Sequence, residues 1–457
     1  MIRHNYLRAM MLSAITVFAW ANTLLSDVIV VQTELLIIGA GPAGLALARH
    51  YSGKRRLLER EGEAGGLCRS FEIGGGVFDI GGHSFHTPHP DVDRFVRALM
   101  GKNWSVQPRD ARVYFNGELI PYPFQHNFEK LSNINVIEEC RQAARSDPHG
   151  ATNFEDWIVA RFGAGVASHF MLPYNRKLWA RDLRRMSCEW VAERVADPSI
   201  GNTAMGIGKR KPLQSNSWVG YPADGGFGEI YKTMAKACGP IEFNCDVIRI
   251  DPNEKTLECK DGRVWHWGRL ASTMPVPLLL KSIQGTPPSL QERADQLEAV
   301  ALRILMILVA HPLPNAPQRI YVSHPAIPPH KVAFNHTSSE RLRQRPMHAI
   351  MCEISHSTEK PLPSDVDLES ATTEWLMDAG LVPSREDIAQ IVHFDAMFGY
   401  PVYTHDRVAI MGEIRAFLES KLIHTLGRFG AWEYANSDEC IRQGMELARQ
   451  LAASHSV

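Results

Sequence analysis

A glycine-rich loop near the start of the chain is the first segment whose residue types and spacing could do chemistry. It reads Gly39-Ala-Gly41-Pro-Ala-Gly44 and stands between the apolar run 34–38 and the helix-forming run 45–50. In such a strand–loop–helix unit the first glycine allows a tight turn, the second lets backbone N–H groups approach a pyrophosphate, and the third lets the helix pack on the strand. The helix N-terminus then faces the anion with its partial positive charge. The spacing therefore predicts a dinucleotide-binding loop.

A carboxylate follows at the place where such a unit needs one. Leu57-Leu58-Glu59 ends a second predicted strand, about twenty residues after Gly39. Glu59 can accept hydrogen bonds from both hydroxyls of a ribose, and it disfavours a 2′-phosphate. FAD or NAD is therefore preferred to NADP.

Composition excludes several other classes of protein. The 457 residues suggest about three domains, or one large catalytic body with insertions. With 49 basic and 50 acidic residues the net charge is -1, which argues against a nucleic-acid partner or a polybasic membrane binder. No serine stands in a GxSxG elbow, so a hydrolase is not supported.

The cysteines and histidines predict neither a disulfide framework nor a metal site. None of the 8 cysteines forms a CxxC pair, so a reduced, cytoplasmic compartment is the default. Several histidines gather late in the chain without a pair in HExxH context, and we interpret them as surface and sheet residues. They are His311, His324, His330, His336, His348 and His356.

Residues 1–31 do not fit a cytoplasmic protein. No charged residue occurs from Ala9 to Ser26, and Ala19-Trp20-Ala21 has the form of a signal-peptidase site. A mis-assigned start codon, a membrane anchor over residues 9–26 and a secretory signal all remain open. The first recognisable strand begins near Thr33, so we treat residues 1–31 as an extension that folding does not need.

Periodicity places the elements that must position these residues. Helices are predicted over 89–101, 134–145, 153–172, 366–380, 407–422 and 437–452. A hairpin is predicted over 113–120, with Asn116-Gly117 as its turn. Strands are predicted over 241–250, 256–260 and 264–267, and antiparallel sheet over 300–356.

Further motifs resemble one flavoenzyme superfamily. Gly65-Gly66-Leu-Cys-Arg69-Ser70 and Phe78-Asp-Ile-Gly-Gly82-His83 follow the loop, and Tyr114-Phe-Asn-Gly-Glu-Leu-Ile-Pro-Tyr-Pro-Phe-Gln125 comes later. Residues 153–158, 170–180, 192–195, 218–228, 272–275, 399–403 and 427–434 continue the likeness. Together they resemble the FAD-dependent amine oxidase and protoporphyrinogen oxidase superfamily, and within it the UDP-galactopyranose mutase branch. The likeness is specific in 33–230 and 395–440.

The resemblance implies a role for individual residues. The expected catalytic residues are His83, Arg194 and Arg428. The expected FAD contacts are Gly39, Gly41, Gly44, Glu59, Gly66, Arg69, Gly82, His83, Val247, Arg428 and Asn436. The expected substrate contacts are Gln125, Phe170, Asn175, Trp179, Arg194, Asn216, Tyr400 and Tyr434, because a sugar nucleotide needs guanidinium forks and aromatic faces.

One departure from the resemblance concerns phosphate binding. Mutases of the eukaryotic type carry an Arg-Gly near residue 310, whereas this chain has Ala310-His311-Pro312. Arg303 and Arg319 are near in sequence, but neither fits the pattern. The loss of one clamp costs about 1.5–3 kcal/mol of charged hydrogen bonding, or it indicates a different substrate.

The sequence thus predicts an α/β fold with a doubly wound, Rossmann-like FAD domain, a helical insertion and an antiparallel sheet substrate domain. The expected boundaries are 33–87, 216–284 and 395–457 for the discontinuous FAD domain, 88–215 for the mostly helical substrate domain, and 285–394 for the sheet domain.

The resemblance implies a nucleotide-sugar isomerase that interconverts pyranose and furanose rings through reduced flavin N5, in cell-surface polysaccharide biosynthesis. NAD(P)H is the candidate external reductant, a UDP-sugar the expected small-molecule partner, and an oligomer remains possible. An amine or C–H oxidoreductase like protoporphyrinogen oxidase is the alternative. A non-catalytic FAD-binding scaffold is a third hypothesis. It is disfavoured because His83 and Arg428, which are expected to face the flavin, would then have no catalytic role.

Overall fold

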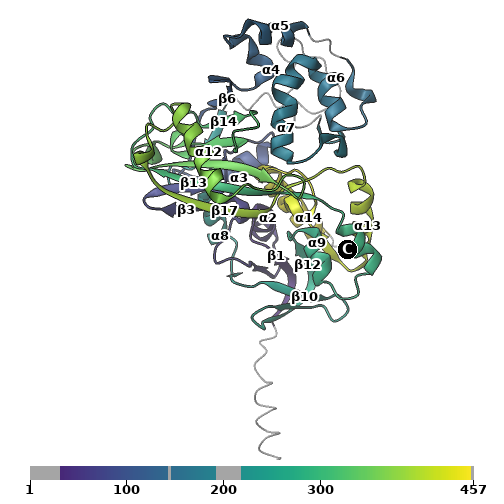
Figure 1. Ribbon diagram of the computed structural model, residues 1–457. Helices are drawn as coiled ribbons and strands as arrows, with labels where there is room; N and C mark the ends of the chain where they lie inside the picture. Colours follow the sequence, from purple (N-terminus) through teal and green to yellow (C-terminus); the bar gives the residue numbers. More distant parts are fainter. Residues whose placement is uncertain (1–30, 143–145, 192–217, 454–457) are drawn as a thin grey trace, which may run out of the picture.

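A mostly parallel sheet forms the lower half of the molecule in Figure 1. The computed structural model describes residues 31–142, 146–191 and 218–453. The strand order of this sheet is β10-β11-β12-β1-β2-β9, and β18 also pairs with β12. The central strands are β1 (Val31–Ile38), β2 (Arg55–Leu58), β9 (Ile241–Glu242), β12 (Val264–Ser272) and β18 (Ile423–Thr425), and all of their mutual pairings are parallel. Segments far apart in the sequence therefore build one sheet.

Helices cover both faces of this sheet, as a doubly wound fold requires. Leu35 and Ile37 of β1 pack into a core with one helical layer, which contains α2 (Pro42–His50), α3 (Pro90–Met100), α8 (Glu229–Lys236) and α15 (Ser437–Ala453). Leu36 and Ile38 pack into another core with α9 (Val276–Ser282), α10 (Pro288–Ala294) and α13 (Arg407–Ser420). Successive side chains of a strand point to opposite faces, so β1 serves both cores. The predicted helices 89–101, 407–422 and 437–452 are confirmed.

The predicted strand 241–250 is wrong, because the chain changes neighbours within it. β9 pairs with β2, whereas β10 (Val247–Asp251) pairs antiparallel with β11 (Thr256–Cys259). Between them Asn244 adopts a left-handed φ of 54°, which ends the extended run. Cys245 and Cys259 form a disulfide across this hairpin, with 5.6 Å between their Cα atoms. The sequence did not predict this bridge, and the other six cysteines are free, so no disulfide framework forms.

A second sheet lies above the first in Figure 1. Its order is β17-β13-β16-β15-β14-β6-β7. The strands are β6 (Ala111–Phe115), β7 (Glu118–Pro121), β13 (Ala299–Val309), β14 (Arg319–Val322), β15 (Lys331–Ala333), β16 (His348–His356) and β17 (Ile388–Pro401). All pairings are antiparallel except β14 with β6. The predicted antiparallel region and the hairpin at Asn116-Gly117 are confirmed, since these turn residues have φ values of 47° and 89°.

A helical layer stands at the top of Figure 1 and comprises α4 (Phe124–Asn127), α5 (Ile134–Gln142), α6 (Phe154–Val166) and α7 (Leu172–Trp179). The predicted single helix over 153–172 is wrong. Gly163 leaves the helical region with φ 77° and ψ 163°, and a π-helical turn over Ala167–Met171 leads into α7. At Gly165 an added Cβ would lie 2.2 Å from the Glu139 carbonyl oxygen, so this glycine lets α5 and α6 approach closely.

The remaining elements are short or peripheral. They are β3 (Ser70–Ile73), β4 (Gly76–Asp79), β5 (Ser105–Pro108), β8 (Trp218–Tyr221), α11 (Glu340–Arg343), α12 (Asp365–Asp378) and α14 (Gly427–Gly430). The predicted helix 366–380 corresponds to α12. The α/β fold class is confirmed, and the domain boundaries stay a prediction.

Within the part of the chain that the structure describes, no helix has the length and apolar character needed to cross a bilayer. Residues 9–26, the candidate anchor, lie outside the described residues.

Candidate active site

The three glycines of the first loop have three different surroundings. At Gly39, with φ +97°, an added Cβ would lie 2.1 Å from Thr273 Oγ1, and at Gly44 it would lie 2.0 Å from the Gly39 carbonyl oxygen. At Gly41 it would meet nothing within 4 Å, and α2 begins at the next residue. The turn, the open approach to a helix N-terminus and the close packing are the three features that a dinucleotide loop needs. The residues present therefore fit a pyrophosphate.

Glu59 lies at the end of β2 beside this loop. Its carboxylate accepts hydrogen bonds from Ala40 N at 2.7 Å and from Glu61 N at 2.9 Å. Burial raises the pKa of Glu59, and these two N–H groups oppose the rise. Each carboxylate oxygen retains a lone pair, so ribose hydroxyls can still be accepted.

The second glycine segment packs directly on the first. Gly65 N donates to Ala40 O at 2.8 Å, and a Cβ on Gly66 would lie 3.4 Å from the Gly41 Cα. Arg69 closes the segment, since its Nε donates to Gly66 O at 3.0 Å and its Nη1 lies 3.5 Å from Glu61. The Gly65–Arg69 segment, predicted as a second pyrophosphate contact, thus packs against the dinucleotide loop.

Two further predicted cofactor residues lie elsewhere on the domain. Val247 begins β10, 8% exposed, and the Asn436 carbonyl accepts from Cys440 N at the start of α15. Their contacts with a cofactor stay predictions.

The His83 imidazole lies flat on the ring of Phe227, with 4.8 Å between centroids and 9° between planes. Burial lowers the pKa of His83 to about 3, and Lys331, Arg428 and Arg319 lower it further by charge repulsion. The imidazole is therefore neutral at neutral pH. Its Nδ1 is shielded from solvent and has no hydrogen-bond partner in the described structure.

A buried carboxylate holds the turn that carries Phe227. Asp79 accepts from Ser70 Oγ at 2.6 Å, Tyr221 Oη at 2.6 Å and Phe227 N at 3.0 Å. Burial raises the pKa of Asp79 to about 6, although all three donors favour its ionised form. These bonds fix the turn from the inside.

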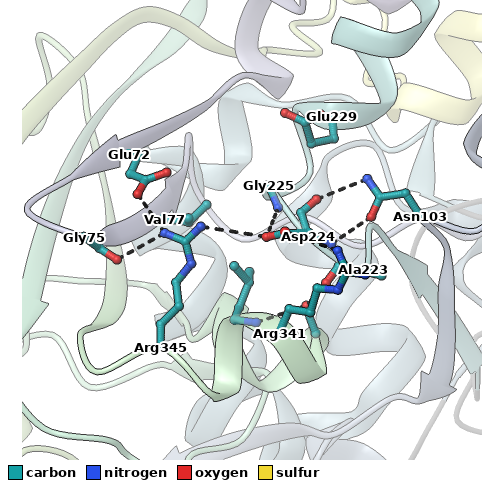
Figure 2. A network of polar contacts seen from close by, with 12 residues as sticks. Glu72, Gly75, Val77, Asn103, Ala223, Asp224, Gly225, Glu229, Arg341 and Arg345 are labelled. Atoms are coloured by element: carbon teal, nitrogen blue, oxygen red, sulfur yellow. Dashed lines mark hydrogen bonds and ion pairs between the residues drawn. The ribbon is translucent and has the colours of Figure 1, made fainter.

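Figure 2 shows the same turn held from the outside. Asp224 N donates to Asn103 Oδ1 at 2.9 Å, and the Asp224 carboxylate lies 3.5 Å from Arg341 and 3.8 Å from Arg345. Arg345 also bonds Glu72 at 2.9 Å and thereby joins the β3–β4 hairpin to the turn. The support beneath His83 therefore reaches the protein surface.

Glu353 links the His83 loop to the second sheet. Gly82 N donates to Glu353 Oε1 at 2.6 Å, Lys331 Nζ lies 2.7 Å from the same oxygen, and Tyr400 Oη donates to Oε2 at 3.2 Å. The carboxylate is 3% exposed. No motif in the sequence indicated Glu353 or Lys331. A lone acidic residue in the apolar run of β16 was the available signal.

Three predicted substrate residues form an aromatic wall. The ring centroids of Tyr400 and Tyr434 lie 5.5 Å apart, and the Trp179 ring lies 6.2 Å and 5.8 Å from them. The Arg428 guanidinium lies 5.6 Å and 5.4 Å from the two tyrosine centroids. Arg428 also donates to the carbonyls of Ala435 and Gly399, at 2.8 Å and 3.0 Å.

The other predicted substrate residues lie in the helical layer. Phe170 is stacked between Phe124 and Tyr174, with centroid distances of 5.0 Å and 5.3 Å. Asn175 donates to Met171 O at 2.7 Å, and Gln125 is 7% exposed. All three are buried, and Phe170 belongs to the same core as Trp179. Arg194 and Asn216 lie outside the described residues.

A second tyrosine group adjoins the wall and was missed. The Tyr321 ring lies 4.6 Å from the Tyr122 centroid and 5.8 Å from that of Tyr174. Arg109 and Arg319 stand beside it. Of the two arginines noted near residue 310, Arg303 forms ion pairs with Asp365 and Asp395, whereas Arg319 donates to Ser84 Oγ at 3.0 Å.

No metal cluster occurs in the described ranges, where no three His, Cys, Asp or Glu side chains are grouped to hold an ion. His336 and His348 instead stack on each other, with 3.8 Å between ring centroids.

Known proteins share both the loop and the whole fold. A family model described as an NAD(P)-binding Rossmann-like domain matches residues 37–99. The crystal structure of reduced UDP-galactopyranose mutase matches with a TM-score of 0.82 and 28% identity, over 92% of this chain and 96% of that one.

Two oxidase structures are similar in fold at lower identity. One from Exiguobacterium sp. 255-15, provisionally named a protoporphyrinogen oxidase, gives a TM-score of 0.71 at 14% identity. It covers 93% of this chain and 100% of its own. Cyclohexylamine oxidase from Brevibacterium oxydans IH-35A gives 0.68 at 13% identity, over 93% and 100%.

The loop is that of an NAD(P)-binding Rossmann-like domain, and the whole fold is similar to those of a UDP-galactopyranose mutase and of two oxidases. The chain resembles the UDP-galactopyranose mutase branch of the FAD-dependent amine oxidase and protoporphyrinogen oxidase superfamily, which confirms the resemblance that its motifs indicated.

Proposed function

We propose that the chain binds FAD between the glycine loop and the His83 loop. Gly41, Gly66 and Arg69 would hold the pyrophosphate, and Glu59 the ribose. His83, on its Phe227 support, would face the flavin ring. The open space at Gly41 supports this proposal, since no protein atom lies within 4 Å of the position a side chain would take.

The proposed reaction is the interconversion of the pyranose and furanose rings of a UDP-sugar. Reduced flavin supplies a nucleophilic nitrogen for the sugar's anomeric carbon, so the chain's own residues only position the substrate and offset its charge. Tyr434 and Arg428 would bind the diphosphate, because hydroxyl and guanidinium groups are donors for phosphate oxygens. Tyr400 would join them by exchanging its bond to Glu353 for one to a phosphate oxygen.

The aromatic wall carries this proposal. The Tyr400 and Tyr434 rings lie within 5.6 Å of the Arg428 guanidinium, and Trp179 packs on both rings, in a chain that is 28% identical to a UDP-galactopyranose mutase. An apolar or amine substrate would not need a guanidinium and two phenols together. The neutral His83 is compatible with a site that holds polar groups without adding charge.

An amine or C–H oxidase is the second candidate. The observation that favours it is the missing clamp near residue 310, since Arg303 is engaged by Asp365 and Asp395 on the sheet surface.

Turnover under anaerobic conditions decides between the two. The flavin-loaded protein is reduced with dithionite and incubated with UDP-galactopyranose, and the ring size of the product is read by NMR. We expect the furanose form without net consumption of reductant. An unchanged sugar, together with oxygen uptake on mixing aerobic enzyme with amines, would replace the mutase by the oxidase.

The hydroxyl of Tyr434 provides a matched binding test. Loss of one hydrogen bond to a charged phosphate costs about 1.5–3 kcal/mol, so Tyr434→Phe should weaken UDP binding about ten- to a hundredfold. Tyr114→Phe is the control, because Tyr114 packs on Trp375 at 5.3 Å in another core.

A further inference from the structure

Two guanidinium groups converge on the hydroxyl of Tyr321. Arg109 Nη2 donates to Tyr321 Oη at 3.2 Å. Arg319, at the start of β14, lies within hydrogen-bonding reach of the same hydroxyl and donates through Nη2 to Ser84 Oγ. Ser84 directly follows His83, so Arg319 contacts the loop that carries His83.

This pair brings positive charge without a counter-charge. In the described residues, neither Arg109 nor Arg319 forms an ion pair with a carboxylate, whereas Lys331 has Glu353. The Nε atoms of both arginines are shielded from solvent and have no acceptor among those residues. Both arginines are partly buried. Charges withdrawn from water are normally paired, so an anion from outside the described chain would complete this pair.

Tyr321 itself offsets only part of the charge. Burial would raise the pKa of Tyr321, but Arg109, Arg319 and Lys331 outweigh burial and lower the pKa to about 8. At neutral pH the phenol is therefore mostly protonated and cannot act as the missing counter-ion.

The register of the second sheet separates this pair from the aromatic wall. Tyr321 is paired with Lys331, and Lys331 with Glu353, in one row across β14, β15 and β16. Tyr400 reaches Glu353 from the far side of that row. Two inter-strand spacings place the backbones of β14 and β16 roughly 10 Å apart. The Arg109–Arg319 pair and the Arg428 end of the aromatic wall therefore stand at different parts of the site, which can take two anionic groups.

We propose that Arg109 and Arg319 form a second anion subsite, which binds a carboxylate carried by the sugar of the substrate. The enzyme then takes a nucleotide-linked uronic acid in preference to the neutral hexose. The inference rests on the proposed function, in which Tyr400, Tyr434 and Arg428 hold the diphosphate. A planar guanidinium group can bind a carboxylate through two parallel hydrogen bonds. The guanidinium groups of Arg109 and Arg319 both lie beside the Tyr321 hydroxyl.

Three ligands test the subsite on the flavin-loaded full chain. UDP, UDP-galactose and UDP-galacturonate are titrated separately, and the flavin absorbance reports binding. In the wild type we expect UDP-galacturonate to bind about tenfold or more tightly than UDP-galactose. In Arg319→Gln that ratio should fall to about one, while the affinity for UDP stays unchanged.

Three further variants serve as controls for this test. Arg112→Gln removes a guanidinium of neighbouring β6 that pairs with Asp110 at 2.6 Å, and it should leave all three affinities unchanged. Arg109→Gln replaces Arg319→Gln if the latter does not fold. Arg319→Lys should restore only part of the ratio, because an ammonium cannot form the planar contact.

Three results would overturn the inference. Equal affinities for the two sugars in the wild type would show that no carboxylate is recognised. A loss of UDP affinity in Arg319→Gln as large as the loss for UDP-galacturonate would place the diphosphate, and not the sugar, at this pair. Absence of UDP binding to the wild type would refute the proposed function and the subsite with it.

Discussion

The Gly82 backbone N–H and the Lys331 ammonium bind the same oxygen of Glu353, at 2.6 Å and 2.7 Å. One buried carboxylate thus connects the loop that carries His83 with a cation of β15 in the second sheet. The His83 loop and this sheet are therefore held together through a single side chain.

The first prediction concerns acid stability. The pKa of His83 is lowered to about 3 in the folded protein, against 6.5 in the unfolded chain. The unfolded state therefore binds one more proton between these values. The contribution of neutral His83 to stability is complete above pH 6.5 and declines as the pH falls toward 3.

Urea unfolding at several pH values between 7 and about 4 measures this effect. His83→Gln should reduce the steepness of the acid decline by about one proton. His149→Gln is the control, since the His149 side chain is 81% exposed. Equal slopes in wild type and His83→Gln would contradict a buried neutral imidazole.

The second prediction separates cofactor binding from folding at the glycine loop. A Cβ at Gly41 meets nothing within 4 Å, so Gly41→Val should fold normally and lose its flavin. Gly44→Ala should instead destabilise the fold itself, because its Cβ would lie 2.0 Å from the Gly39 carbonyl oxygen.

Circular dichroism measures whether each variant folds, and the flavin released on denaturation measures how much cofactor it had bound. A yellow Gly41→Val protein with wild-type flavin content would show that the pyrophosphate does not pass this residue.

The third prediction concerns the Cys245–Cys259 disulfide, which closes a loop over a sequence separation of 14. A loop of this length is worth about 3 kcal/mol of unfolding free energy in the chain-entropy model. The double variant Cys245→Ser/Cys259→Ser should lose about 2–3 kcal/mol, and reductant should destabilise the wild type only. If reductant has no effect on the denaturation midpoint of the wild type, the two thiols are not paired in solution.

The fourth prediction concerns the N-terminal extension. β1 begins at Val31, where it pairs with Trp265 of β12. A protein that begins at Gln32 loses only one position of this ladder and should be soluble and flavin-loaded. Aggregation of the shortened chain, measured by gel filtration, would make residues 1–31 part of the fold.

Features encoded within a short window were predicted correctly. Gly39, Gly41 and Gly44 identify the loop because each position leaves no room for a side chain or must stay open to a ligand. Asn116-Gly117 identifies the hairpin because these two residue types readily adopt left-handed φ values. The prediction of one strand over 241–250 was wrong because the hydrophobic pattern alone does not show a change of partner strand. The disulfide was not predicted because Cys245 and Cys259 meet only when β10 and β11 pair.

The sequence predicted only some of the residues that the structure brings together at the candidate site. Trp179, Tyr400, Tyr434 and Arg428 stand in family-like strings, and the structure brings them together. Arg109, Arg319 and Glu353 belong to no motif, since their neighbours come from strands distant in sequence. Arg109 and Arg319 stand out because no carboxylate of the described residues pairs with them, and Glu353 because several groups bind it. Only the three-dimensional structure shows these relationships.

The row of Tyr321, Lys331 and Glu353 has a consequence for how such enzymes diversify. Backbone hydrogen bonds of three strands fix the spacing of these positions, whatever side chains occupy them. A single substitution can therefore change the charge at one point of the sheet while its neighbours keep their places. A sheet of this kind can change its charge pattern by one residue at a time, without rebuilding the glycine-loop end of the molecule.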